Sequence, residues 1–189
     1  MNSEEYIDIL NADGSPSGSS CLKSEIHAQG YYHNTAHVWF YSTDGKIVLA
    51  QRAASKIICP LLWDVSVAGH VDAGEIIEEA AIRETKEEIG LTITPSELEK
   101  IGVYNCFQSY PNGIQDNEFH HTFITELKQN LETLKLDKNE VAQVKFVTFA
   151  EFRSLLQNSD HNGHFVSSNT PYYFDVLEAI ETRIEKNVS

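Results

Sequence analysis

Residues 69–91 read GHVDAGEIIEEAAIRETKEEIGL, and the prediction of both fold and chemistry starts from this segment. Its glycines, glutamates and single arginine have the spacing G-x5-E-x7-R-E-x-x-E-E-x-G. The motif residues are Gly69, Glu75, Arg83, Glu84, Glu87, Glu88 and Gly90. At average residue usage, seven specified residues arise at a given start with a chance on the order of one in a hundred million or less. The spacing is therefore too specific to be accidental, and it indicates a functional site.

The segment predicts a helix with its last three glutamates on one face, because they are related by i, i+3 and i+4. Asp72 and Glu75 have capping-box spacing, which predicts that the helix starts there. Gly90 predicts a left-handed cap at its end. Apolar spacing predicts a core-facing side formed by Ile77, Ala81, Thr85 and Ile89.

Carboxylates packed this closely repel one another unless cations lie between them. The cluster offers only oxygen ligands, which suit Mg²⁺ or Mn²⁺, and Mg²⁺ is commonly shared with substrate phosphates. Arg83 lies four residues before Glu87 and can reach back toward Glu75, neutralising part of the cluster. The alternative is a solvated acidic helix face, which is the commoner origin of a lone E-x-x-E-E, but the complete string favours a metal site.

The segment resembles the Nudix box, the signature of hydrolases that cleave nucleoside diphosphates linked to another moiety. It matches at every charged and glycine position and departs at Thr85, where the family usually has an aliphatic residue. The resemblance implies an α/β fold, a Nudix-type α/β/α sandwich with a mixed β-sheet. It implies one domain over residues 1–189, with an N-terminal extension at 1–34, the box at 69–91 and a C-terminal helix at about 172–185.

The flanks resemble the branch of the superfamily that holds isopentenyl-diphosphate isomerase and its hydrolase relatives, over roughly residues 4–127. The similar stretches are QRAASK at 51–56, WDVSVAGH at 63–70 and SEIHAQGYYHNTAHVWF before them. In the isomerases, three histidines and two acids hold a metal. The matching positions of a second metal site are His27, His33, His70, Asp116 and Glu118, with Asp116 in place of a usual Glu. Arg52 and Lys56 match basic residues that bind the diphosphate.

Ala68 separates the two branches. The isomerases need a catalytic Cys immediately before the Gly-His pair, and this chain has Ala68 there. An alanine cannot exchange a proton, so isomerisation loses an essential acid/base partner. The complete box also favours hydrolysis, since isomerases tend to carry an eroded one. An isopentenyl-diphosphate delta-isomerase-like enzyme and a non-catalytic nucleotide-binding sensor domain are the alternatives, and the intact glutamates argue against the sensor.

Residues and resemblance together predict a metal-dependent Nudix diphosphate hydrolase (a pyrophosphohydrolase) that uses Mg²⁺ or Mn²⁺ to activate water. Its substrate is a small phosphorylated molecule: a nucleotide, sugar nucleotide, dinucleotide or isoprenoid diphosphate. The metal ligands in this interpretation are the Gly69 carbonyl, Glu84, Glu87 and Glu88, oriented by Arg83 and Glu75. The substrate-binding cations are Arg52 and Lys56. The general base stays open between Glu118, Glu87 and Glu88.

Composition restricts the partners and the location. The chain has 14 Lys+Arg against 28 Asp+Glu and a formal net charge of −14, which disfavours nucleic acid polymers and anionic membranes. No apolar run approaches the roughly 20 residues that span a bilayer, and the acidic start MNSEEYIDIL lacks a signal-peptide pattern. A cytoplasmic protein is therefore expected. Many similar proteins form a homodimer, although the sequence does not settle the oligomeric state.

Periodicity and turn residues predict the remaining elements. The expected strands are Tyr6–Leu10, His37–Ser42, Ile47–Arg52, Trp63–Ala68, Ile101–Ser109, Glu118–Glu126 and Val144–Phe149. The expected helices are Phe149–Gln157 and Tyr172–Glu185. Asp44-Gly45 predicts a hairpin between the second and third strands. Residues 11–20, NADGSPSGSS, predict a turn-rich loop, and residues 158–170 predict another that borders the substrate cleft.

Overall fold

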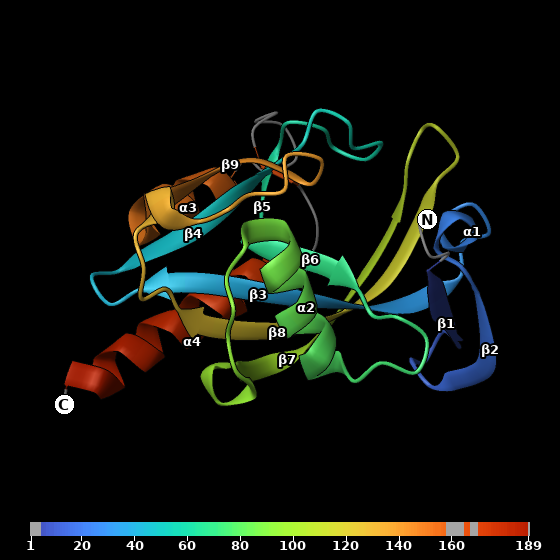
Figure 1. The fold of residues 1–189 in the computed structure, drawn as a ribbon, viewed down its shortest axis with the longest axis horizontal. Coiled ribbons are helices and arrows are strands. Elements are labelled where there is room, and N and C mark those ends of the chain that lie inside the picture. Colours follow the sequence, from blue (N-terminus) through green and yellow to red (C-terminus); the bar gives the residue numbers. More distant parts are fainter. Residues whose placement is uncertain (1–4, 158–164, 167–169, 189) are drawn as a thin grey trace.

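The computed structural model describes residues 5–157, 165–166 and 170–188 (Figure 1). The strands are β1 (Tyr6–Leu10), β2 (Pro16–Leu22), β3 (Tyr32–Ser42), β4 (Lys46–Arg52), β5 (Trp63–Asp64), β6 (Val67–His70), β7 (Glu99–Ser109), β8 (Gln115–Glu126) and β9 (Val141–Thr148). The helices are α1 (Lys23–Ile26), α2 (Ile77–Ile89), α3 (Phe149–Gln157) and α4 (Thr170–Val188), with short 3₁₀ turns at Pro95–Glu97 and Leu131–Thr133. No helix within these residues is long and apolar enough to cross a membrane.

Strand β3 lies at the centre of a mixed sheet. It pairs in parallel with β8 from Tyr32↔Asn117 to Tyr41↔Glu126, and antiparallel with β6 from Thr35↔His70 to Val38↔Val67. It also pairs antiparallel with β1 and β4. The mixed sheet expected from the sequence is confirmed.

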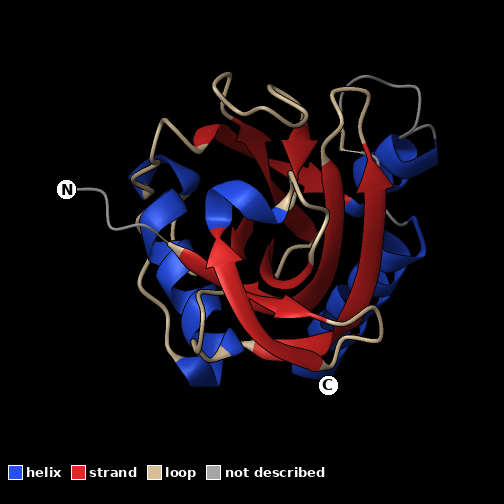
Figure 2. Cartoon of the chain, turned by 90° about the vertical axis from the view of Figure 1, so that its right-hand side faces the viewer, coloured by secondary structure: helices blue, strands red, loops and turns tan. Residues whose placement is uncertain are grey.

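Helices cover both faces of this sheet (Figure 2). Ala36, Val38 and Phe40 of β3 pack with buried residues of α2, whereas Trp39 and Tyr41 pack with α3 and α4. This split follows the period of two in a strand, which sends alternate side chains to opposite faces. The α/β/α sandwich is confirmed. The division into a single domain over residues 1–189 stays a prediction.

Along one face of β3 the side chains change from polar to apolar. His33, Thr35 and His37 come first, and Trp39 and Tyr41 follow on the same face. All five side chains are buried. The apolar end is covered by α3 and α4, whereas Thr35 and His37 line a cavity. The sheet therefore positions a polar floor at one end of β3.

Several elements differ from the sequence prediction in their position or bounds. Residues 16–20, expected in a loop, belong to β2, which pairs with β1 from Tyr6↔Leu22 onward. These residues are largely exposed, so they carry no apolar alternation, and pairing with β1 overrides their low strand propensity. The expected strand Trp63–Ala68 is divided into β5 and β6. The C-terminal helix is longer than expected, at Thr170–Val188.

The predicted start of α2 is also wrong. The helix begins at Ile77, four to five residues after the expected position, and Ile76 is its N-cap without a side-chain cap. The N–H of Asp72 donates to Oε2 of Glu75 at 3.0 Å inside the preceding loop, and Arg83 binds the same carboxylate. The predicted end is confirmed, since Gly90 has φ of 69° and its N–H donates to the carbonyl of Lys86.

His121 makes the stability of this fold pH-dependent. Its Nε2 lies 2.9 Å from Oδ1 of Asn34, and its Nδ1 lies 3.2 Å from Nζ of Lys100, so both nitrogens are satisfied in the neutral ring. Burial and the nearby charge of Lys100 lower the pKa of His121 from 6.5 to about 4. The unfolded chain therefore binds this proton first, and stability falls as the pH drops from 6.5 to 4.

We expect His121→Gln to reduce this pH dependence. Urea unfolding of wild type and variant between pH 8 and 4 measures it, and the difference in unfolding free energy should be constant above about pH 7 and change below about pH 6.5. Parallel curves over the whole range would contradict the assignment.

Candidate active site

A cavity of about 510 Å³ lies at the polar end of β3 and gathers residues from both predicted groups. The predicted residues that line it are His27, Arg52, Lys56, Gly69, His70, Arg83, Glu84, Glu87, Glu88, Asp116 and Glu118. Glu75 and His33 lie behind this lining: Glu75 holds Arg83, and His33 is fully buried. The structure thus brings the box helix and the histidines into one cleft.

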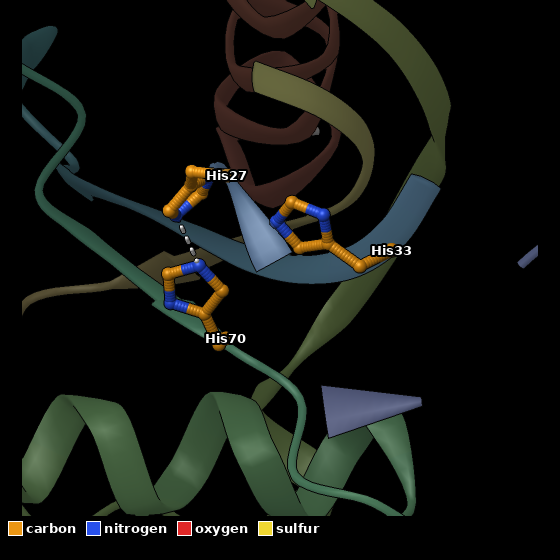
Figure 3. A group of neighbouring side chains, drawn as sticks. All are labelled: His27, His33 and His70. Atoms are coloured by element: carbon orange, nitrogen blue, oxygen red, sulfur yellow. Dashed lines mark hydrogen bonds between the residues drawn. The ribbon is translucent and has the colours of Figure 1, made fainter. Parts of the chain in front are cut away.

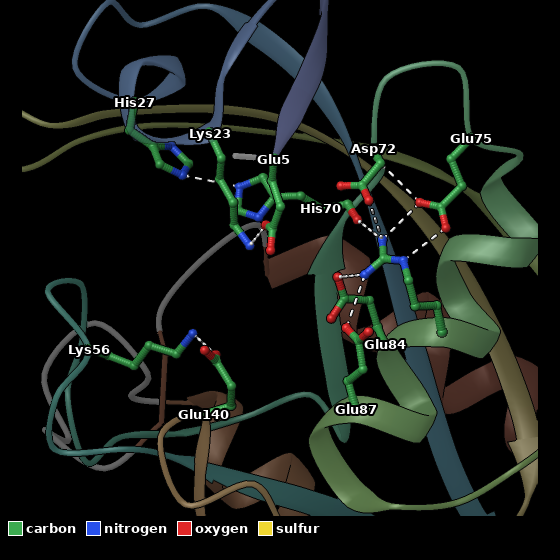
Figure 4. A network of polar contacts seen from close by, with 11 residues as sticks. Glu5, Lys23, His27, Lys56, His70, Asp72, Glu75, Glu84, Glu87 and Glu140 are labelled. Carbon is green, nitrogen blue, oxygen red and sulfur yellow. Dashed lines mark hydrogen bonds and ion pairs between the residues drawn. The ribbon is translucent and has the colours of Figure 1, made fainter. Parts of the chain in front are cut away.

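Arg83 is the centre of the acidic cluster. Its guanidinium donates to Glu75 at 2.8 and 2.9 Å, to Glu84 at 2.7 Å and to Glu87 at 3.2 Å. It also donates to the backbone carbonyl of His70 at 2.9 Å, which ties α2 to β6. Figure 4 shows these three carboxylates converging on the guanidinium that lies between them. The hydrogen bonds with Glu75 outweigh burial and raise the pKa of Arg83, so this cation stays charged.

Glu84 and Glu88 both line the cleft. Burial raises the pKa of Glu84, although Arg83 opposes this shift. Burial, followed by the charge of Glu84, raises the pKa of Glu88 well above its ordinary value. Among the described residues, the carboxylate oxygens of Glu84, Glu87 and Glu88 do not all lie within 4.8 Å of one another. Arg83 bonds two of these glutamates directly, so their charges are compensated by a side chain.

Gly69 allows Glu84 to reach this position. A Cβ added at residue 69 would lie 1.9 Å from Cδ of Glu84, well inside van der Waals contact. We expect Gly69→Ala to displace the Glu84 carboxylate and lower kcat/KM about 10²-fold, the scale of a 1 Å misplacement in an active site. Steady-state kinetics measures the effect. Gly18→Ala, in strand β2 where no atom lies within 4 Å of the added Cβ, is the control. An unchanged kcat/KM in Gly69→Ala would contradict the expected displacement.

Three histidines from α1's end, β3 and β6 converge at the other side of the cleft (Figure 3). The ring centroids of His27, His33 and His70 are 5.1–5.2 Å apart in all three pairs. A metal about 2.1 Å from each ring nitrogen would lie about 3.2 Å from each centroid, which places cis ligand centroids about 4.6–5.3 Å apart. The three rings therefore have the spacing of ligands to one ion.

Unpartnered buried atoms support the same interpretation. Within the described residues, Nδ1 of His27, Nε2 of His33 and Oδ1 of Asp116 are buried without a hydrogen bond. His27 and Asp116 approach to 3.3 Å, and His33 and Glu118 to 3.5 Å. Nδ1 of His33 lies 3.0 Å from the Tyr31 carbonyl and must donate to it, which leaves Nε2 with its lone pair toward the site. This donor set fits a divalent cation such as Mn²⁺.

The acids beside these histidines have opposite pKa shifts. Burial and the charge of Glu118 raise the pKa of Asp116. Burial also opposes ionisation of Glu118, but the hydrogen bond from His120 and the nearby ring of His33 outweigh burial and hold the pKa of Glu118 well below the ordinary value. Burial and the neighbouring His33 lower the pKa of His70 well below 6.5, which keeps its ring neutral as metal ligation requires.

The predicted substrate cations are both paired with acids. Arg52 lies 3.3 Å from Asp64 and donates through Nε to the carbonyl of Ile58 at 3.0 Å. Lys56 contacts Glu140. Sequence reasoning missed a further cation of the lining, Lys23, which binds Glu5 at 2.7 Å. The sequence signal that could have found Lys23 is its position, one helical turn before His27.

Sequence reasoning also gave no role to His37 and His120. Both line the cleft, and with Glu118 they form a further group whose donor atoms lie within 4.8 Å of one another. His120 and His121 are neighbours on β8, so their side chains lie on opposite faces of the sheet. Val166, from the region predicted to border the cleft, lines it, while residues 158–164 and 167–169 lie outside the described residues.

The family model of the NUDIX domain matches residues 31–167. The chain belongs to the Nudix family. It is 35% identical over 162 residues to Nudix hydrolase 3 of Arabidopsis thaliana, which covers 83% of this chain and 21% of that protein. It is 31% identical over 150 residues to an isopentenyl-diphosphate Delta-isomerase of Escherichia coli, which covers 78% of this chain and 79% of that enzyme.

Solved structures share this fold, among them a NUDIX hydrolase from Nitrosomonas europaea with a TM-score of 0.56 at 19% identity, covering 77% of this chain and 88% of that one. The crystal structure of DR0079 from Deinococcus radiodurans superposes with a TM-score of 0.67 at 19% identity, covering 94% of this chain and 98% of that one. The family and fold expected from residues 69–91 are therefore confirmed. This Nudix chain spans about a fifth of the plant protein's length but most of the bacterial isomerase.

Proposed function

We propose that this Nudix chain is a hydrolase that cleaves a diphosphate linkage in a nucleotide or a small organic diphosphate with Mg²⁺ or Mn²⁺. The observation that carries the proposal is one cleft that combines the carboxylates of α2, the cations Arg52 and Lys56, and the histidine group. Acids of α2 and histidines of β3 and β6 supply ligands of different hardness, so the cleft suits more than one divalent ion.

The proposed role of each residue follows from its position in the cleft. Glu84, Glu87 and Glu88 with the Gly69 carbonyl would hold metal on the α2 side, and His27, His33, His70, Asp116 and Glu118 on the other. A bound divalent ion supplies charge neutralisation of the phosphates and a more acidic water. Arg83 and Glu75 hold the α2 carboxylates in place. Arg52 and Lys56 would release the carboxylates that they now bind and contact the phosphate oxygens of the substrate instead.

Three glutamates compete for the role of general base: Glu118, Glu87 and Glu88. A base works best when its pKa lies near the working pH. Burial raises the pKa of Glu88, whereas the hydrogen bonds of Glu118 lower its pKa. Without metal ligation Glu88 is therefore a stronger base than Glu118, and the general base stays open among the three glutamates because metal ligation by either would lower its pKa.

A release screen tests the proposal. Orthophosphate and pyrophosphate are measured with Mg²⁺, Mn²⁺ or EDTA over nucleoside di- and triphosphates, sugar nucleotides, dinucleotides and isopentenyl diphosphate. We expect metal-dependent release from at least one class, and chromatography of the products identifies the bond that breaks. Absence of metal-dependent release over the panel would contradict the hydrolase proposal.

The second proposed function is isomerisation of isopentenyl diphosphate, which the complete histidine group favours. Ala68 opposes it, since it lies in the cleft opposite His37 in the β3–β6 register and offers no exchangeable proton. We expect no isomerase activity in wild type and measurable isomerase activity in Ala68→Cys, followed by proton exchange with deuterated water. Ala68→Ser is the matched control, and isomerisation by wild type would contradict hydrolysis as the main activity.

The sensor alternative predicts nucleotide binding without turnover, and the same screen with a binding assay separates it from an enzyme. The expected cytoplasmic location and homodimer stay predictions. The net charge of −14 supports a small substrate over a nucleic acid polymer, because like charge slows encounter with a polyanion.

A further inference from the structure

Glu118 is held by two histidines through different oxygens. Its Oε1 lies 3.5 Å from Nε2 of His33, and its Oε2 lies 2.8 Å from Nε2 of His120. The carboxylate oxygen can only accept, so Nε2 of His120 donates to it. One oxygen is thus fixed by a hydrogen bond, while the other faces the histidine group.

The ring of His120 is itself supported from behind. His37 stacks on it with centroids 3.9 Å apart and planes 24° apart. Nδ1 of His37 lies 2.8 Å from the hydroxyl of Tyr172, which also accepts a hydrogen bond from Nε1 of Trp39 at 2.7 Å. His37, His120 and Tyr172 are all at least nine-tenths buried. A continuous chain of contacts therefore runs from helix α4 to Glu118.

His37 and His120 lie too close together to be a pair of ligands to one ion. Their centroid distance of 3.9 Å is shorter than the about 4.6–5.3 Å of cis ligands. These two histidines thus differ from the His27, His33 and His70 group.

We infer that His120, supported by His37 and Tyr172, is a positioning residue that orients Glu118 toward the histidine group. The inference rests on the proposed function, in which Glu118 is a metal ligand. Carboxylates that bind metals are usually hydrogen-bonded by a further side chain, and loss of such a partner typically costs 10–100-fold in metal affinity. The C-terminal helix α4 then contributes to the metal site through Tyr172 without touching the ion.

Mn²⁺ affinity of full-length variants, measured by calorimetry and by electron paramagnetic resonance of free Mn²⁺, tests the inference. His120→Gln retains an amide N–H that can reach Glu118, whereas His120→Asn has a shorter side chain and His120→Leu has no donor. We expect affinity close to wild type for Gln and about 10–100-fold weaker for Asn and Leu. Tyr172→Phe should weaken binding in the same direction by less, and His121→Gln, on the opposite face, should not change it.

The Gln–Asn pair separates positioning from a structural role, because both variants place a polar amide at the same buried site. Equal Mn²⁺ affinity of Asn, Gln and wild type would overturn the inference while leaving the metal dependence intact. If His120→Leu fails to fold, the Asn and Tyr172→Phe variants still decide. Wild type that binds no Mn²⁺ would contradict the proposed function, and the inference with it.

Discussion

Glu87→Gln is expected to lower kcat by about 10²–10³-fold, the range measured when one group that stabilises transition-state charge is removed. The swap removes a charge at nearly constant size. The Glu87 side chain is 59% exposed and makes one contact, at 3.2 Å, with Arg83. Exposed substitutions of this kind change stability within about 0.5 kcal/mol. A loss of activity would therefore report chemistry and not unfolding.

Glu79→Gln is the matched control for this prediction. It lies on the same helix α2 and is exposed, but it does not line the cleft. Kinetics at saturating Mg²⁺ and a thermal melt of both variants complete the test. Retained turnover in Glu87→Gln, or equal losses in both variants, would contradict the assignment of Glu87 to the metal cluster.

The sequence predicted helix α2 well because its signals are local. Spacing of i, i+3 and i+4 and a glycine at the end depend on neighbouring residues in one helix, and Gly90 caps α2 as expected. The start of α2 was mispredicted: Glu75 does accept from the N–H of Asp72, but Arg83, eight residues further on, binds the same carboxylate within the loop, and the helix begins only at Ile77. The sequence spacing of a capping box does not show which other groups will hydrogen-bond to its carboxylate.

The histidine group was reached through resemblance, since its members come from distant parts of the chain. His27 follows α1, His33 lies on β3, and His70 lies on β6. Their approach depends on the β3–β6 pairing, which no local pattern encodes. The contact of Tyr172 with His37 spans 135 residues and had no sequence signal at all. Tertiary pairing therefore accounts for what sequence reasoning missed.

His33→Gln is expected to weaken Mn²⁺ binding by more than about 100-fold because it removes a metal ligand. This loss exceeds the about 10–100-fold effect of removing a residue that only hydrogen-bonds to a ligand. His33 is fully buried and its Nδ1 is occupied by the Tyr31 carbonyl, so its Nε2 is the atom left for a metal. A glutamine amide can replace the hydrogen bond to Tyr31 but not the imidazole lone pair. The two roles of the ring are thereby separated.

Thermal melts with and without Mn²⁺ decide between a metal site and histidines that only hydrogen-bond in the cleft. A ligand at 100 times its Kd stabilises the folded state by about 2.7 kcal/mol. Wild type should show this stabilisation, and it should weaken at acid pH because ligation requires neutral imidazoles. His33→Gln should lose it at the same Mn²⁺ concentration, while His121→Gln should retain it. Equal stabilisation of wild type and His33→Gln would assign the Mn²⁺ to the α2 carboxylates alone and would leave the histidines as hydrogen-bonding residues of the cleft.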